Sequence, residues 1–209
     1  RSMGLLFALI VFLITFSAAS FFAKSTQDQN KADYQARLDQ QASSLASFTR
    51  SSVDGVNRLL LSSSAVFAVK PDVTNDEWQR IYQMSQHDEA FSEVVGIGFA
   101  SVIAPESRED FQQAQRDNGR ENFTVNSPSP QDRLSVITYL APNSPENDRA
   151  IGYDMYSESA RRTAQQQARD TAETVMTAPV NLVQDGDKAQ KKGILAYYPV
   201  YSTPEIPTT

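Results

Sequence analysis

The amino-acid sequence predicts an α+β fold, in which one long N-terminal helix precedes a domain of short helices and antiparallel strands. Three observations support this class. None of the 10 prolines of the 209-residue chain lies before Pro71, so the first third lacks the strongest helix breaker. Beyond Pro71, short apolar runs rich in β-branched residues alternate with polar segments. The connections after Val175 are short enough for antiparallel hairpins, unlike the crossovers of a doubly wound sheet.

Residues 3–23 form an uncharged apolar stretch, MGLLFALIVFLITFSAASFFA. As a helix this stretch would extend about 30 Å, the thickness of the hydrocarbon core of a bilayer. We therefore predict a transmembrane anchor over residues 1–24. Two alternatives stay open. One is a cleaved signal peptide, since residues 17–19 weakly resemble a cleavage site, and the other is a buried core helix.

Residues 25–70 are predicted to form a stalk helix. Apolar side chains recur there in a seven-residue frame that has a polar gap at Ser52, and the frame consists of Leu38, Leu45, Leu59 and Val66. The second half is expected to pack on a domain. The first half suits either a solvated stalk or a loose coiled coil with a second copy of the chain, and we expect a homodimer through this helix. A single long core helix is the alternative.

Residues 71–209 hold the shorter predicted elements. Helices are expected at residues 74–87, where Thr74 and Glu77 fit a capping box, and at 106–117 and 158–171. Strands are predicted at residues 94–102, 123–126, 134–140, 151–155, 175–182 and 194–201. Polar loops rich in proline are expected between them, including residues 127–130 and 142–147.

Composition excludes several classes of function. The chain has no cysteine, which removes disulfides, thiol catalysis and cysteine-based metal sites, and its single histidine, His87, argues against a Ser-His-Asp triad. A net charge of −6 and the absence of a basic stripe argue against nucleic-acid binding. The Gly96-Ile97-Gly98 segment lacks the third glycine of a dinucleotide loop. We therefore expect no catalytic residue, no metal site and no cofactor.

The most specific pattern lies toward the C-terminus. It consists of Ile151-Gly152-Tyr153-Asp154-Met155, Ser157-Glu158, Arg161-Arg162, Ala168-Arg169-Asp170-Thr171, Pro179-Val180, Leu182-Val183 and LAYYPVY at 195–201, with VGIGFA at 95–100 before it. In this order the segments resemble the CHASE family of extracytoplasmic sensor domains, which serve bacterial histidine kinases, diguanylate cyclases and plant cytokinin receptors. Tyr153 stands where the family usually has Phe, and Ala172 where it usually has Gly.

The resemblance implies a long stalk helix that carries PAS-like antiparallel-sheet domains, the membrane-distal one holding the ligand. Residues 71–209 would be this sensor domain, with its C-terminal part truncated. In cytokinin receptors an aspartate at a strand end contacts the purine ligand, and a backbone position 22 residues later assists. Asp154 and Met176 match these two positions, with Met176 in place of the family leucine.

The residues themselves leave the role of Asp154 open. A carboxylate between a strand end and a helix start can accept hydrogen bonds from a ligand, but it can equally cap the helix near Ser157 or pair with Arg161. Three further positions, on strands expected to flank the same cavity, are weaker candidates for ligand contact: Tyr139, Ala196 and Tyr198. Arg161 and Arg162 are expected on a solvated helix face rather than in an anion site.

These observations predict an extracytoplasmic, periplasmic small-molecule-sensing domain of a receptor in the inner or plasma membrane. It would be held by residues 3–23 and would pass a ligand signal through a dimeric stalk to a cytoplasmic histidine kinase or diguanylate cyclase. The ligand class is open, with purine-like molecules among the candidates. The alternative is a structural or protein-interaction ectodomain with no small-molecule ligand. An anchored or secreted enzyme has only surface carboxylates in its favour.

Overall fold

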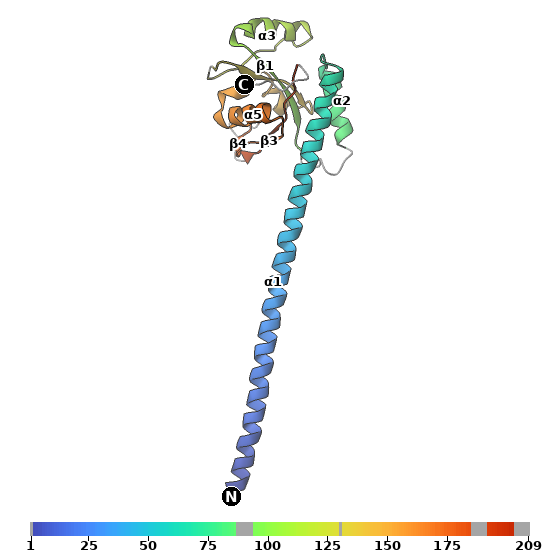
Figure 1. Ribbon diagram of the computed structural model, residues 1–209. Helices are drawn as coiled ribbons and strands as arrows, with labels where there is room; N and C mark the ends of the chain where they lie inside the picture. The colour runs from blue at the N-terminus through green and yellow to red at the C-terminus, as the bar shows by residue number, and fades with distance from the viewer. Residues whose placement is uncertain (1, 87–93, 130, 185–191, 203–209) are drawn as a thin grey trace. The chain divides into compact units, whose positions relative to one another are not determined.

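The computed structural model describes residues 2–86, 94–129, 131–184 and 192–202, without the side chains of 2, 3, 5–9, 11, 28 and 32. It confirms the predicted α+β class, with a long helix followed by small antiparallel sheets (Figure 1). The chain divides into two compact units, Arg1–Ser51 and Ser52–Thr209.

The first element, α1 (Ser2–Val69), is a single α-helix that includes the predicted stalk except its last residue, Lys70. It extends unbroken because no proline interrupts it. Over the part of the chain that the structure describes, no helix is both long enough and apolar enough to cross a bilayer. The predicted anchor at residues 3–23 falls partly on side chains outside the described set, and it stays a prediction.

The helix α2 (Asn75–Ser85) begins with the predicted capping box. Thr74 Oγ1 accepts a hydrogen bond from the backbone N–H of Glu77 at 3.3 Å, and the Thr74 backbone N–H donates to Glu77 Oε2 at 2.8 Å. Lys70 Nζ reaches the same carboxylate, 2.6 Å from Oε1. This arrangement ties the end of α1 to the start of α2. The predicted end of the helix, His87, lies outside the described residues.

We predict that this ion pair makes stability depend on pH at the acid end. Hydrogen bonds from Lys70 and then from Thr74 lower the pKa of Glu77 from 4.5 to about 2. Because the folded-state pKa is the lower one, the stabilisation is fully present above the unfolded value of 4.5 and is lost as the pH falls towards about 2. In urea unfolding followed by Trp78 fluorescence, the wild type should therefore lose more stability over this range than Glu77→Gln.

Glu77→Gln is the informative variant because glutamine keeps the capping geometry and removes only the charge. The same substitution at the exposed Glu121 is the control and should leave the acid dependence as in the wild type. If the free energy of unfolding falls equally steeply with decreasing pH in the wild type and in Glu77→Gln, the prediction is contradicted.

The main sheet pairs β1 (Ile97–Ile103) with β2 (Leu134–Ala141), antiparallel over the full length of both. Between them lie the 3₁₀ turn η2 (Pro105–Ser107) and α3 (Arg108–Asp117), close to the predicted helix at 106–117. A register shift between Phe99 and Ala100 leaves Thr138 of β2 as an extra residue, and such a bulge bends the strand that contains it. The predictions for both strands are confirmed within a few residues.

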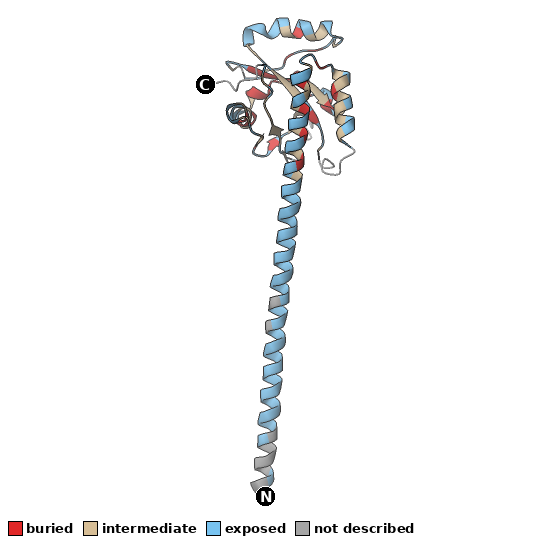
Figure 2. Ribbon diagram, turned by 45° about the vertical axis from the view of Figure 1, so that its right-hand side comes forward, coloured by how far each residue is buried: buried red, intermediate tan, exposed pale blue. Residues whose placement is uncertain are grey.

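Three apolar clusters make up the core, and Figure 2 shows buried segments in the sheet and in the helices packed on it. One cluster joins Leu59 and Phe67 of α1 to Trp78 of α2 and Ile97 of β1. Phe67 also stacks on Phe99, with ring centroids 4.2 Å apart. The expectation that the second half of the long helix packs on a domain is therefore confirmed.

Two predicted strands are wrong. Residues 123–126 and 151–155 form only the single bridges Asn126↔Tyr153 and Val136↔Asp154. Turns shape the second segment, because the backbone N–H groups of 151 and 153 donate to the carbonyls of 148 and 150. The predicted loop at 142–147 is also partly wrong, since it contains the start of the short helix α4 (Pro145–Asp148).

The chain then enters η3 (Met155–Ser157) and α5 (Ser159–Thr171), which ends at Ala172 with a left-handed φ of 55°. The predicted strands at 175–182 and 194–201 are shorter than expected. Pro179, which has no backbone N–H, interrupts the first of them. Two antiparallel pairs, β3–β6 and β4–β5, confirm the predicted hairpin-like pairing. Their strands are β3 (Val175–Met176), β4 (Val180–Asn181), β5 (Lys192–Gly193) and β6 (Ala196–Tyr197).

Candidate functional site

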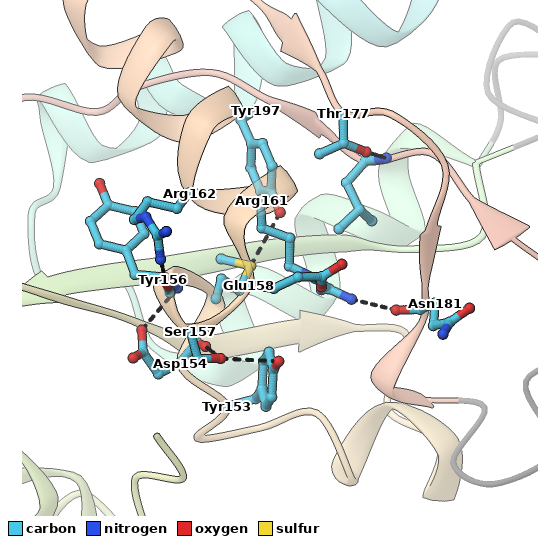
Figure 3. Close-up of polar contacts among 12 residues, drawn as sticks. Tyr153, Asp154, Tyr156, Ser157, Glu158, Arg161, Arg162, Thr177, Asn181 and Tyr197 are labelled. Atoms are coloured by element: carbon cyan, nitrogen blue, oxygen red, sulfur yellow. Dashed lines mark hydrogen bonds and ion pairs between the residues drawn. The ribbon is translucent and has the colours of Figure 1, made fainter. Parts of the chain in front are cut away.

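Asp154 is fully buried, with 0% of its surface exposed, where the 151–155 turn enters η3. Its Oδ1 accepts hydrogen bonds from the backbone N–H groups of Ser135, at 2.8 Å, and Tyr156, at 3.0 Å. Its Oδ2 accepts from Ser127 Oγ at 2.8 Å. The carboxylate therefore caps η3 and joins it to β2, so the structure realises the capping role and not the pairing with Arg161 (Figure 3).

Arg161 on α5 pairs instead with Glu158. Its Nε lies 2.5 Å from Glu158 Oε2, and its Nη2 donates to the backbone carbonyl of Asn181 at 2.6 Å (Figure 3). Only 2% of Arg161 is exposed, so the expectation of a solvated face is wrong for this residue. Arg162 is half-buried and donates to the carbonyl of Tyr156 at 2.5 Å. Both arginines serve to fasten α5 to neighbouring backbone.

Tyr197 of β6 lies close to the ion pair between Arg161 and Glu158. Burial raises the pKa of its hydroxyl to about 12, so the group stays protonated at neutral pH. The hydroxyl donates to Met155 Sδ at 3.4 Å, which connects β6 with η3. The interior beneath α5 is thus a polar network that is already satisfied by the protein at Asp154, Arg161 and Tyr197.

An open recess of about 270 Å³ lies between α5 and β3. It is lined by Ser159, Ala160, Thr163, Ala164, Gln167, Val175, Met176, Thr177 and Ala178. Ala160 and Ala164, one helical turn apart, leave the space that a larger side chain would fill. The described residues that line another hollow, of about 700 Å³, all belong to α1 between Phe22 and Gln35, so they do not supply the second wall that would enclose a ligand.

Met176 is one of the residues that line this recess. The backbone N–H of Thr177 donates to the carbonyl of Leu195 at 2.8 Å, while Met176 lies opposite Ala196. Hydrogen-bonded and non-hydrogen-bonded pairs alternate along an antiparallel ladder. The N–H and C=O of Met176 therefore point away from β6, and the residue is 39% exposed.

The structure brings together only two of the five sequence-predicted contact residues, Met176 and Ala196, which face each other across β3 and β6. Of the five, only Met176 lines the recess. Tyr139 lies on β2 in the cluster around Trp78, where the Arg120 guanidinium lies 4.4 Å from its ring centroid. Tyr198 follows β6 and is half-buried.

Sequence reasoning missed the α5 wall of the recess. The available signal was the pair of alanines at 160 and 164, beside polar residues at 159, 163 and 167 on the adjacent helical row. The pattern indicates a narrow helix face, but it does not say what packs there, because β3 contributes the opposite wall from a separate segment.

Comparison with known families gives a match over the C-terminal two thirds of the chain. The CHASE domain family model matches residues 71–209, which include α2, the β1–β2 sheet, η3 and α5 together with the small strands. A comparison with curated proteins finds no match. CHASE domains are extracytoplasmic sensor domains. Since the matched segment covers well over half of the chain, the protein belongs to the CHASE domain family.

Proposed function

We propose that this chain is the extracytoplasmic sensing region of a membrane receptor, which binds a small molecule in the recess between α5 and β3. The observation that carries the proposal is the recess itself, because it contains Met176, the position at which the family resemblance expects a main-chain contact with the ligand. The outward N–H and C=O of Met176 supply a donor and an acceptor for such a contact.

A hydrogen bond offers a route from this site to the long helix. Thr174, directly before β3, donates through Oγ1 to Asn57 Oδ1 on α1 at 2.5 Å. A ligand that binds one arrangement of β3 and α5 better than another would shift the population of that arrangement. Movement of β3 would then alter the Asn57 contact and hence α1. The cytoplasmic output in this proposal is a histidine kinase or a diguanylate cyclase.

The stalk is proposed to act as a homodimer. Large apolar side chains of α1 in the first compact unit are exposed at steps of four, seven and three residues, which fit the a and d positions of a coiled-coil heptad: Tyr34, Leu38, Leu45 and Phe48. A second copy of the chain would cover this stripe. The apolar segment at residues 3–23 supports anchoring in the inner or plasma membrane, with residues 25–209 outside the cytoplasm.

Within this proposal Asp154 is a positioning residue. Its three hydrogen bonds hold η3, and η3 leads directly into the first turn of α5, which forms one wall of the recess. Ala196 supports β3 from the neighbouring strand. Tyr139 and Tyr198 are assigned supporting roles in the packing around the sheet.

The second candidate function is a structural or protein-interaction ectodomain that binds no small molecule. One observation favours it: the carboxylate of Asp154, the expected ligand contact, is enclosed and accepts its hydrogen bonds from the protein itself.

Calorimetric titration of the chain with adenine, amino acids and dicarboxylates tests the proposal. At least one compound should bind the wild type, and Met176→Trp, which fills the recess, should weaken that binding by about tenfold or more. Ile194→Trp places the same side chain at an exposed position outside the recess and should leave the affinity unchanged. Binding that Met176→Trp does not weaken would overturn the site, and a chain that binds no compound would favour the second candidate.

A further inference from the structure

We infer that the recess selects an uncharged ligand with an amide-like edge, and that Gln167 and Thr163 on α5 determine this specificity. The inference rests on the proposed function, since it names the chemistry of the same site. Gln167 and Thr163 belong neither to the CHASE-like segments of the sequence nor to the backbone contact that is expected at Met176.

None of the described residues that line the recess has an ionisable side chain. The closest basic residues in sequence are already engaged, because Arg161 pairs with Glu158 and Arg162 donates to the carbonyl of Tyr156. A charged group that enters this open recess would give up part of its hydration and would gain no partner of opposite charge among these lining residues. An uncharged ligand does not carry this cost.

The two walls offer hydrogen bonds of a matching kind. Ser159, Thr163 and Gln167 stand at i, i+4 and i+8, so their side chains form one row along α5. Among the described residues, the side chains of Thr163 and Gln167 make no hydrogen bond. On the other wall lie the outward N–H and C=O of Met176.

A carboxamide and a peptide unit each present a donor beside an acceptor. An amide-like edge on the ligand can therefore pair with Gln167 on one side or with the Met176 main chain on the other. The methyl groups of Ala160 and Ala164 lie on the adjacent row of the helix and admit a flat, apolar body. A site built to form such bonds discriminates strongly against analogues that cannot form them.

Three pyridines of one size test this chemistry: nicotinamide, nicotinate and 3-(aminomethyl)pyridine carry a neutral amide, a carboxylate and an ammonium group. In titrations of the chain followed by backbone amide NMR, nicotinamide should bind about tenfold more tightly than either charged compound. The changes in backbone amide chemical shift that nicotinamide causes should centre on residues 159–167 and 175–178. Tighter binding of a charged member, or shifts centred elsewhere, would overturn the inference.

Gln167→Glu and Gln166→Glu form a matched pair of surface variants. Both replace an exposed glutamine of α5 by glutamate, but only Gln167 lines the recess. Gln167→Glu should lower the affinity for nicotinamide by about tenfold and raise the affinity for 3-(aminomethyl)pyridine, whereas Gln166→Glu should change neither affinity. Equal effects of the two variants would contradict a specificity role.

The two ideas fail in different ways. If one of the charged pyridines binds most tightly and Met176→Trp still prevents its binding, the proposed site is supported and the inferred preference for an uncharged ligand is wrong. If Met176→Trp leaves the binding of every compound intact, the proposed site itself falls.

Discussion

Replacing Asp154 by alanine should destabilise the protein by about 3–5 kcal/mol. The substitution removes the acceptor of three hydrogen bonds and leaves the backbone N–H groups of Ser135 and Tyr156 without partners in the interior. Ser135 is 0% exposed and Tyr156 5%, so water cannot readily replace the lost acceptor. Urea unfolding monitored through Trp78, the single tryptophan, measures the loss directly.

Two variants sharpen this experiment. Asp154→Asn keeps one carbonyl oxygen for the two backbone donors and should cost clearly less than the alanine variant, about 1–2 kcal/mol. Asp132→Ala, at an exposed loop position, should stay within about 0.5 kcal/mol of the wild type. If Asp154→Ala keeps wild-type stability while ligand affinity drops, Asp154 contacts the ligand directly and its positioning role is refuted.

Gly152→Ala is expected to have an effect of comparable size, about 3–5 kcal/mol. Gly152 has a φ of +82°, and an added Cβ would lie 2.0 Å from the backbone carbonyl oxygen of Thr124. The residue cannot move away easily, because its N–H donates to Ile137 and its carbonyl accepts from Asn126. The same unfolding experiment should show a large fall in the urea midpoint.

Gly119→Ala is the matched control for this clash. Gly119 also has a positive φ, +88°, but an added Cβ would meet no atom of the described residues within 4 Å. Gly119→Ala should therefore lower the free energy of unfolding only through backbone strain, by about 1 kcal/mol. If both variants lose equal stability, the positive φ alone explains the need for glycine at position 152, and the clash with Thr124 plays no part.

Local signals predicted the helices well. The long α1, the capping box at Thr74 and the helices near 106–117 and 158–171 depend on residues within a few positions of one another. Breakers, caps and apolar spacing act over that range and are visible in the sequence. The β1–β2 pair was also visible, because each strand is a distinct run of apolar and β-branched residues.

The predicted strand at residues 151–155 shows where local signals fail. Ile151, Tyr153 and Met155 alternate as a strand would, yet Gly152 takes a left-handed conformation that a strand does not contain. The segment follows the course of residues 124–126 and 135–137, and its bonds to them replace those of a regular ladder. Contacts with two distant segments outweighed the local pattern.

The family could be anticipated from motifs along the chain, whereas the hydrogen-bond partners of Asp154 and Arg161 could not. Ser135 approaches Asp154 from 19 residues away, and Asn181 approaches Arg161 from 20. Whether a carboxylate meets a ligand or a backbone N–H depends on which segment folds beside it. Periodicity and caps record neighbours in sequence, whereas burial and hydrogen-bond partners arise only when separate segments pack together.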